Sequence, residues 1–436
     1  DVCSSDLLFL YSVDEALIKQ CIEISCVEKK NKNNNSFSFG WTISLASFKD
    51  DLIYNYFRFN SKFEMRQTNI HFFNKVYNTS KAEDIQKFNE KISKLIYVSY
   101  RSKYKPQINI KNNKTFTSDC GWGCMIRSSQ MILCRALYKV FKYIYKLDKT
   151  AIYDVIPFIM DKNLDVVKYK YLGMDSYINK LKEFGKEDII EIDPPFSIHK
   201  IVILGQKYGR TSGEWFSDFE LPKIYNIINS TFNIIPGLSI IHYNSFIELK
   251  TILNRCFKEI VSENNENEIN YKDDNTFNFD GKKYIMEKMG LIFVSVRLGL
   301  DNVTADYFPS IKKLFSCKEC LGFIGGKKWT NSASYFFGYY ENILLYLDPH
   351  FNNQSIDQLD NNNVLTYTNK NIYQLDLKTL KAGFTIGFLF RNMKEFNELL
   401  IFLKELKNEQ YSCFSFTEKN IEKNISEDMI NDISDK

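Results

Sequence analysis

The sequence predicts an α+β domain in which a long buried helix comes first and a group of strands follows. Between Met125 and Lys146 apolar residues recur at intervals of three and four, which is typical of a helix with a buried face. Downstream, the apolar runs are short, continuous and bounded by turn residues, which is typical of buried strands. Because helices and strands do not alternate along the chain, this order favours an α+β domain over a series of βαβ units.

The hydrophobic pattern places the remaining elements in chain order. We expect a strand at Leu291–Val296, a β-hairpin formed by Ser334–Tyr340 and Ile343–Asp348, a strand at Phe384–Phe390 and a helix at Met393–Leu406. With 44% hydrophobic and 15% aromatic residues, the 436-residue chain has ample material for a sizeable packed core. The elements therefore predict one domain, interrupted by insertions.

Stretches rich in asparagine and lysine supply those insertions. They lie at Lys30–Asn35, Ser262–Asp280 and Asn352–Asn363. Because such polar tracts cannot bury enough apolar surface to offset the entropy lost on ordering, we expect them to be surface loops or disordered insertions.

Charge and cysteine usage exclude several classes of protein. The 57 basic and 53 acidic residues give a formal net charge of +4, which provides no electrostatic footprint for nucleic acid. Ten cysteines are spread thinly over the length, so we expect mostly free thiols in a reducing compartment. No apolar stretch approaches the ~18 residues of a membrane span, and acidic residues precede the short apolar run at Leu7–Tyr11, where a signal peptide needs basic ones. These features predict a cytoplasmic protein.

Cys124 is the candidate nucleophile because of the residues around it. It follows Gly121-Trp122-Gly123, in which the glycines allow a sharp turn, and the long helix begins at or just after it. A thiol at a helix N-terminus faces unpaired N–H groups and the positive end of the helix dipole, and both stabilise the thiolate. The same N–H groups can donate to a developing oxyanion. A cysteine without this context is most often a small buried hydrophobe.

Among the four histidines, His350 is the candidate base. It follows Asp348 and Pro349 at the end of the predicted hairpin, and residues two apart on a strand point to one face, so Asp348 and His350 can pair. The aspartate would then fix the imidazole tautomer and stabilise the imidazolium. Taken by itself, Asp-Pro-His is more simply a turn after a strand. The other three, His71, His199 and His242, are expected to be structural or surface residues.

Two further cysteine arrangements have weaker interpretations. Cys317-x-x-Cys320 has the spacing of a metal or redox pair, but no second pair follows at zinc-site distance. We expect no metal and no organic cofactor. Cys120 precedes Cys124 by four residues, and a thiol on the same groove could cap the nucleophile on oxidation, although filling space is the simpler role.

Several motifs of the chain occur together in a known family. They are Thr117-Ser118-Asp119-Cys120-Gly121-Trp122-Gly123-Cys124-Met125-Ile126-Arg127 with Gln130-Met131, then Ser197-Ile198-His199, Gly213-Glu214-Trp215, Arg297-Leu298-Gly299-Leu300, Leu321 to Lys327, Asn331-Ser332-Ala333 and Tyr346 to His350. In sequence and order they resemble the autophagins, cysteine proteases that process and release the ubiquitin-like modifier of autophagy. The resemblance runs in blocks from about Tyr97 to Leu406.

This resemblance implies a papain-like fold with a small auxiliary subdomain and a catalytic triad of Cys124, His350 and Asp348. Tyr100 would donate its hydroxyl at the oxyanion site. The substrate groove and its gate would be formed by Trp122, Trp215, Lys327, Lys328, Trp329, Thr330, Asn331 and Ser332. The catalytic domain would span residues 97–410. An N-terminal segment, 1–96, would pack on it with an insertion at Ser61–Glu90, and a mobile polar tail, 411–436, would follow.

The implied activity is cleavage after the C-terminal glycine of a ubiquitin-like modifier. The partner would be the modifier as a soluble precursor or joined to phosphatidylethanolamine, with membrane contact only through the lipidated substrate. A narrow tunnel that admits only a residue without Cβ would explain the choice of glycine.

The sequence departs from the family pattern in three places, and two other functions stay open. Cys120 stands where the family usually has a small non-thiol residue, Ser128-Ser129 replaces a usual Cys-Gly, and the gate from Lys327 to Ser332 is longer and bulkier than expected. The alternatives are a modifier-binding protein whose catalytic capacity has faded, and another Cys-His-Asp acyl-transfer enzyme such as a transglutaminase.

Overall fold

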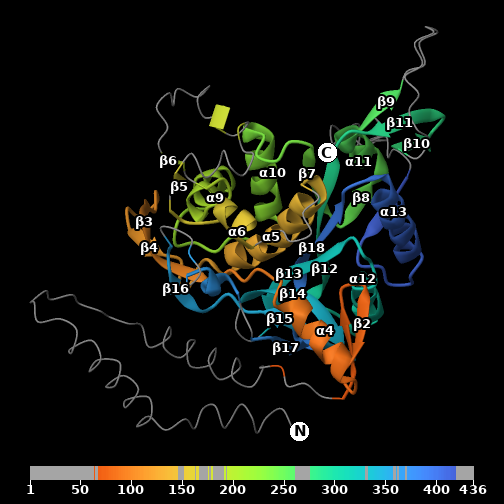
Figure 1. The fold of residues 1–436 in the computed structure, drawn as a ribbon, viewed down its shortest axis with the longest axis horizontal. Coiled ribbons are helices and arrows are strands. Elements are labelled where there is room, and N and C mark those ends of the chain that lie inside the picture. Colours follow the sequence, from red (N-terminus) through yellow and green to blue (C-terminus); the bar gives the residue numbers. More distant parts are fainter. Residues whose placement is uncertain are drawn as a thin grey trace, which may run out of the picture. The chain divides into compact units, whose positions relative to one another are not determined.

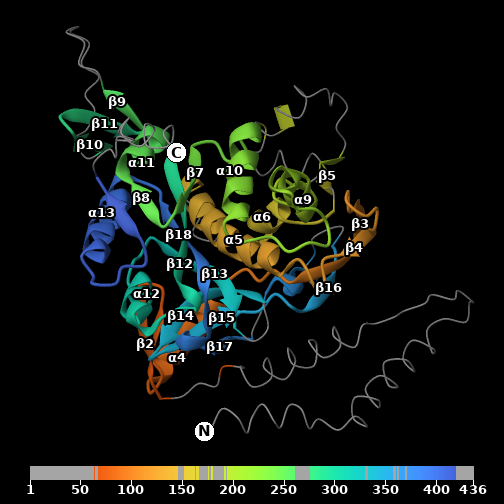
Figure 2. The ribbon, with the colours of Figure 1, turned by 180° about the vertical axis from the view of Figure 1, so that it is seen from behind.

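The structure is a computed structural model that describes residues 63, 67–145, 152–162, 164–165, 175, 178–179, 191–192, 194–260, 275–328, 332–356, 360, 363–368 and 371–418. All of these residues belong to one compact unit, Ile53–Lys436. Within the described ranges no helix is long and apolar enough to cross a membrane. The ribbon is drawn in Figure 1 and from behind in Figure 2.

A nine-stranded sheet forms the centre of the fold. Seven of its strands lie in the order β17 (Tyr373–Asp376), β15 (Ile343–Leu347), β14 (Ala333–Tyr340), β13 (Cys320–Lys327), β18 (Leu380–Phe390), β12 (Met289–Asn302) and β7 (Leu238–Asn244). Neighbours are antiparallel, except that β12 and β7 run parallel. The other two strands, β1 (Asn69–Phe72) and β2 (Lys75–Asn78), form a hairpin whose β1 pairs with β14.

Alternation along the strands divides the core between the two faces of this sheet. In β12, Leu291 and Phe293 pack into one hydrophobic cluster and Ile292 and Val294 into the other, because successive side chains of a strand point to opposite faces. Both views show helices on both sides of the sheet. One side carries α5 (Cys124–Ile144), α6 (Ile152–Val155), α9 (Ile198–Gly205) and α10 (Glu220–Phe232), and the other α11 (Leu249–Cys256), α12 (Phe308–Leu314) and α13 (Met393–Lys407).

Smaller sheets and short helices complete the described chain. One sheet joins β16 (Asn352–Gln354), β3 (Tyr100–Ile108) and β4 (Thr115–Ser118), and in it β16 runs parallel to β3. The others are β10 (Thr276–Phe279), β11 (Lys282–Met286) and β9 (Phe257–Ile260); β8 (Phe246–Glu248) with β19 (Ser415–Thr417); and β5 (Leu164–Asp165) with β6 (Glu191–Ile192). The remaining helix is α4 (Ala82–Ile92), and the 3-10 turns are η1 (Ile156–Phe158), η2 (Gln206–Tyr208), η4 (Ala305–Tyr307), η5 (Asn363–Tyr367) and η6 (Leu377–Thr379).

The elements expected from the hydrophobic pattern are confirmed, and so is the α+β class. The long helix begins at Cys124, and the buried run at Leu291–Val296 lies inside the longer β12. The predicted hairpin is β14 and β15, in which Tyr340 faces Ile343 across the turn at Glu341 and Asn342. The last strand and helix are β18 and α13.

Two of the polar tracts contain strands, so the expectation that they are loops throughout is wrong. In Ser262–Asp280, Thr276–Phe279 forms β10, because it pairs with the adjacent β11 and Phe277 packs against Phe396 at a ring distance of 5.3 Å. In Asn352–Asn363, Asn352–Gln354 forms β16, because its main chain pairs with β3 and pairing makes no demand on side-chain polarity. Residues 261–274 and the tract at Lys30–Asn35 lie outside the described residues.

The expectation of a mobile polar tail over residues 411–436 is also wrong for residues 411–418. Ser415–Thr417 forms β19 and pairs with β8, and the side chains of Cys413, Phe414 and Phe416 are buried. These apolar side chains join the cluster under α13, so residues 411–418 belong to the packed domain. Residues 419–436 lie outside the described chain, and the boundary at residue 97 stays a prediction.

Candidate active site

Cys124 is the first residue of α5, and glycines shape the turn that precedes it. Gly121 has a φ of +86°, which favours glycine. An ideal Cβ on Gly123 would lie 2.4 Å from Asp119 Oδ2, so a larger residue would displace that carboxylate. The Cys124 side chain, 7% exposed, therefore lies at the N-terminus of a 21-residue helix, where unpaired N–H groups and the helix dipole favour a thiolate.

His350 contacts both Cys124 and Asp348, as the triad hypothesis requires. Its Nδ1 hydrogen-bonds Asp348 Oδ1, its main-chain N–H donates to the same oxygen at 3.2 Å, and its ring hydrogen-bonds the Cys124 thiol. The Tyr97 hydroxyl donates a hydrogen bond to the main-chain carbonyl oxygen of Asp348 at 2.8 Å. The expected contact of Asp348 with His350 is present. Strand alternation, the reason given for it, is wrong, because β15 already ends at Leu347 and a turn brings the two side chains together.

The protonation states of Cys124 and His350 depend on each other. Burial acts to raise the pKa of the Cys124 thiol, but the hydrogen bond and positive charge of His350 outweigh it, and the pKa lies below its ordinary value. Burial acts to lower the pKa of His350, but the charge and hydrogen bond of Asp348 outweigh it, and the pKa lies above its ordinary value. These opposite directions favour a thiolate–imidazolium pair, which is the reactive form of a nucleophilic cysteine.

Tyr100 and Ala333 supply hydrogen-bond donors at the thiol. The Tyr100 hydroxyl and the main-chain N–H of Ala333 both bond to Cys124, and the three residues form a small buried cluster. Burial, followed by the charge of Cys124, raises the pKa of Tyr100 far above its ordinary range, so its hydroxyl keeps its proton and remains a donor. Donors fixed in this way can stabilise an oxyanion that develops beside the sulfur.

A groove of about 520 Å³ opens on Cys124 and contains both tryptophans expected there. Trp122 is only 4% exposed, and its indole N–H donates to Ser118 O at 3.0 Å. Trp215 is 54% exposed, and its indole N–H donates to Gly121 O at 2.8 Å. Trp122 therefore forms part of the wall, while Trp215 offers an apolar face to a ligand. The charged residues along the groove are Asp218, Arg297, Asp301, Lys328 and Lys381.

The expected gate is described only at its two ends. The main-chain N–H of Lys327 donates to Ser332 O at 3.1 Å, and that of Lys328 donates to Thr379 O at 3.0 Å. Trp329, Thr330 and Asn331 lie outside the described residues. The gating role of this segment therefore stays a prediction.

Lys327 places a buried cation next to the catalytic carboxylate. Its Nζ lies 3.9 Å from Asp348 Oδ2 and 4.5 Å from the centroid of the Tyr346 ring, and its side chain is 7% exposed. Burial acts to lower the pKa of Lys327, but the charge of Asp348 outweighs it and the pKa is raised. Asp348 is therefore shared between two cations, the imidazolium of His350 and the ammonium of Lys327.

The other three histidines have structural contacts, as expected. The His71 ring stacks on Tyr339 at 4.4 Å, and His199 Nε2 bonds Lys105 O at 2.8 Å. His242 Nε2 bonds Ser295 Oγ at 2.9 Å, and burial lowers its pKa to about 4. Cys317 and Cys320 are buried free thiols whose pKa values burial raises.

Cys120 is an exposed free thiol, and its environment disfavours the thiolate. Partial burial, then the charge of Asp119, raise its pKa above the ordinary value against the hydrogen bond from Ser118. Peroxide oxidises the thiolate form of a cysteine, and the raised pKa of Cys120 disfavours that form. We therefore expect wild-type and Cys120→Ser enzymes to lose activity at the same rate in hydrogen peroxide. Slower inactivation of Cys120→Ser would instead support the redox switch.

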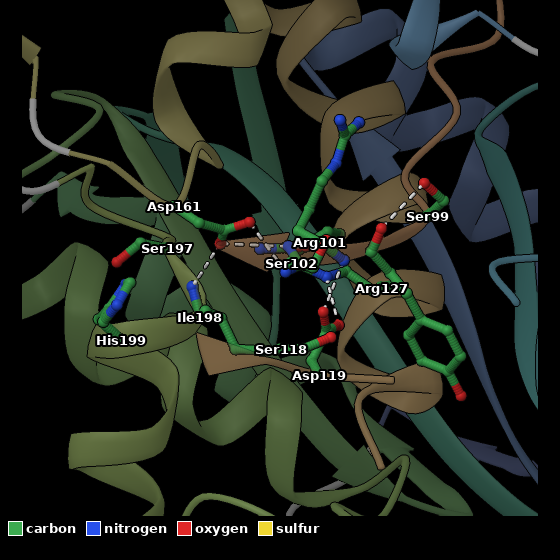
Figure 3. Close-up of polar contacts among 12 residues, drawn as sticks. Ser99, Arg101, Ser102, Ser118, Asp119, Arg127, Asp161, Ser197, Ile198 and His199 are labelled. Carbon is green, nitrogen blue, oxygen red and sulfur yellow. Dashed lines mark hydrogen bonds and ion pairs between the residues drawn. The ribbon is translucent and has the colours of Figure 1, made fainter. Parts of the chain in front are cut away.

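Three features of the site escaped sequence analysis. The donor at Ala333 is a main-chain group, which no residue type signals. The ion pair of Lys327 joins the last residue of β13 to the residue that follows β15, and these two are distant in the sequence. The ion pair of Asp119 and Arg127 joins two charged residues of the Cys124 motif, and their presence in an otherwise apolar stretch was the only available signal (Figure 3).

The fold and the site together define a class of enzyme. An α+β domain with a buried cysteine at a helix N-terminus, a histidine held by an aspartate and an adjoining groove is a papain-like, thiol-dependent protease. The chain belongs to the peptidase C54 family, the autophagins, because it matches the peptidase C54 catalytic domain over residues 85–401. The family expected from the motifs is confirmed.

Relatives in animals and fungi extend the match. The chain is 25% identical over 364 residues to the cysteine protease ATG4C of Xenopus laevis, covering 76% of this chain and 74% of the relative. It is 25% identical over 365 residues to the cysteine protease ATG4D of the same frog, covering 77% and 72%. To the probable cysteine protease atg4 of Aspergillus clavatus it is 24% identical over 358 residues, covering 73% and 74%.

Proposed function

We propose that this protease cleaves after the C-terminal glycine of a ubiquitin-like autophagy modifier, both in the extended precursor and in the modifier joined to phosphatidylethanolamine. The observation that carries the proposal is the contact of the Cys124 thiol with His350 at a groove whose exposed side chains include Trp215. Family membership supports the substrate class. We propose a cytoplasmic location, where the enzyme meets membranes only through its lipidated substrate.

In the proposed mechanism Cys124 is the nucleophile, His350 the acid–base and Asp348 the residue that orients it. The thiolate attacks the glycine carbonyl, and the C–N bond breaks as His350 passes its proton to the leaving amine. The resulting thioester is attacked by a water that gives a proton back to His350, and the C–S bond breaks to free the glycine carboxylate and the thiolate. Tyr100 and the N–H of Ala333 stabilise the oxyanion of both steps.

Selection of glycine is explained by the small space around the Cys124 thiol. The Cys124 thiol hydrogen-bonds the Tyr100 hydroxyl and lines the groove together with the buried Trp122, and Cys124 is less than a tenth exposed. A residue with a Cβ beside the reacting carbonyl would need room there that glycine does not. Trp215 and the segment Lys327 to Ser332 are proposed to hold the extended tail on either side.

The test is incubation of the purified protein with its own cell's modifier in two forms. One form carries residues after the glycine, and the other is joined to phosphatidylethanolamine in vesicles. Mass spectrometry should find the same product from both, a modifier that ends in free glycine. A modifier with alanine in place of that glycine is the control and should be cut far more slowly. Tight binding without cleavage would favour the modifier-binding alternative, and transfer to an added amine would favour the acyl-transfer alternative.

A further inference from the structure

The Asp119 carboxylate joins the segment that carries Tyr100 to the helix that carries Cys124. Oδ1 accepts the main-chain N–H of Arg101, the residue after Tyr100, at 2.6 Å. Oδ2 accepts Nε–H of Arg127, three residues after Cys124, at 2.7 Å. Figure 3 shows the Asp119 carboxylate facing Arg127, with Arg101 nearby. One rigid group thus spans the gap between strand β3 and helix α5.

The main chain of Asp119 holds the same two segments. Its carbonyl accepts the N–H of Gly123 at 2.9 Å, and its own N–H donates to Arg101 O at 3.2 Å. The carboxylate fits closely against Gly123, where a Cβ would lie 2.4 Å from Oδ2. Any movement of Asp119 therefore shifts the residue directly before Cys124 and the residue directly after Tyr100.

Burial makes this connection stiff. The side chains of Asp119, Arg127 and Asp161 are 0%, 1% and 1% exposed. Burial raises the pKa of Asp119 against the lowering charge and hydrogen bond of Arg127, whose own pKa is held well above its ordinary value. Charged hydrogen bonds in a dry environment are short and directional, so they hold their partners in one geometry.

Asp161 holds the opposite side of the same guanidinium and makes no link to Tyr100. Its Oδ2 accepts from Arg127 at 2.8 Å, and its Oδ1 accepts the N–H of Ile198, the first residue of α9, at 3.3 Å. Figure 3 shows Asp161 between Arg127 and Ile198. Asp161 thus anchors α9 to the helix, while Asp119 anchors the oxyanion strand to it.

We propose that Asp119 is a positioning residue that sets the distance between the Cys124 thiol and the Tyr100 hydroxyl. The inference rests on the proposed function, in which Cys124 attacks and Tyr100 stabilises the oxyanion. Reacting groups must keep their near-attack geometry, and a displacement of about 1 Å costs on the order of 100-fold in rate. Asp119 touches no reacting atom, so its effect passes wholly through the two residues that it holds.

The experiment compares Asp119→Asn with Asp161→Asn. Each exchange removes the negative charge and replaces one carboxylate oxygen by an NH2 group, which cannot accept a hydrogen bond, so each removes one buried ion pair from the same cation. We expect the two variants to lower the midpoint of thermal unfolding to a similar extent. Asp119→Asn should lower kcat on the extended modifier by about 100-fold with little change in KM. Asp161→Asn should keep kcat near the wild-type value.

A double-mutant cycle separates positioning from a general structural role. If Asp119 acts by placing the Tyr100 hydroxyl, Asp119→Asn in a Tyr100→Phe background should cause little further loss of kcat. Losses that multiply in the double variant, or equal losses of kcat in Asp119→Asn and Asp161→Asn, would overturn the proposal. Should Asp119→Asn not fold, Asp119→Glu keeps the charge with a longer arm, and it should fold with the same loss of kcat. Failure of both to fold, with Asp161→Asn folded, would also overturn the proposal.

Alkylation of Cys124 distinguishes this inference from the proposed function. The rate of labelling by iodoacetamide, followed at the Cys124 peptide by mass spectrometry, reports thiolate content without any substrate. Its pH midpoint should move upward in Asp119→Asn and stay in place in Asp161→Asn. If the wild-type enzyme leaves the modifier intact while Asp119→Asn still shows this shift, the proposed substrate is refuted and the positioning role is supported.

Discussion

Cys124→Ala is expected to abolish cleavage of the extended modifier while leaving its binding intact. The exchange removes the only atom that the mechanism uses to form the thioester, and losing a nucleophile of this kind lowers kcat by about 10⁶-fold, below detection. Binding should persist because the groove surface, with Trp122 and Trp215, does not depend on the sulfur. Activity is read from the product mass, and affinity from calorimetry with the uncleaved modifier.

A second cysteine provides the matched control for this variant. Cys134 lies ten residues further along the same helix, is fully buried, and has its pKa raised by burial alone. Cys134→Ala should keep kcat near the wild-type value at the cost of some stability. Measurable cleavage by Cys124→Ala would remove Cys124 from the role of nucleophile and with it the proposed mechanism.

Asp348→Asn is expected to lower kcat/KM by about 10²- to 10⁴-fold and to move the alkaline limb of its pH profile to lower pH. The carboxylate now raises the pKa of His350, so its neutral replacement leaves the imidazolium less stable and lets it lose its proton at lower pH. An amide can also hold the ring in the wrong tautomer, which adds to the loss. The measurement is kcat/KM on the extended modifier across the pH range in which the wild type is folded.

Lys327→Met provides a control of opposite sign for the same carboxylate. Lys327 neutralises part of the charge on Asp348 from 3.9 Å, so its removal should raise the pKa of His350 and move the alkaline limb to higher pH. Lys327→Arg keeps the charge and should move the limb little. A shift in the same direction for Asp348→Asn and Lys327→Met would contradict the assignment of this limb to His350.

Local patterns in the sequence were enough to predict the central part of the fold and the nucleophile. The periodicity after Cys124 predicts α5 to within two residues at either end, because a long helix with one buried face shows its period in any window. The turn at Glu341 and Asn342 predicts the hairpin of β14 and β15, because its two strands are adjacent in the chain. The Asp348–His350 pair was predicted from strand alternation, and the contact exists although both residues lie beyond the end of β15.

Features that depend on distant partners were out of reach. β16 forms because residues near 352 meet residues near 100, and nothing in an asparagine-rich stretch signals that pairing. β19 likewise depends on its pairing with the distant β8. β10 differs, because it pairs with its neighbour β11 across Asp280-Gly281, which is a local turn signal inside the polar tract. The donor at Ala333 and the contact between Lys327 and Asp348 arise where β13 and β14 come to rest beside α5, which only the assembled sheet determines.

The parallel pairing of β16 with β3 has a consequence for how the enzyme folds during its synthesis. Tyr100 faces Asn352 across this pair, and the two lie far apart in the chain. A nascent chain that has already exposed Cys124 at the ribosome therefore still lacks its base and its oxyanion strand in final register. Contacts between residues so far apart in the sequence are slow to form. Proteolytic competence thus arises only when the last third of the polypeptide docks, so unfinished chains carry an unactivated thiol.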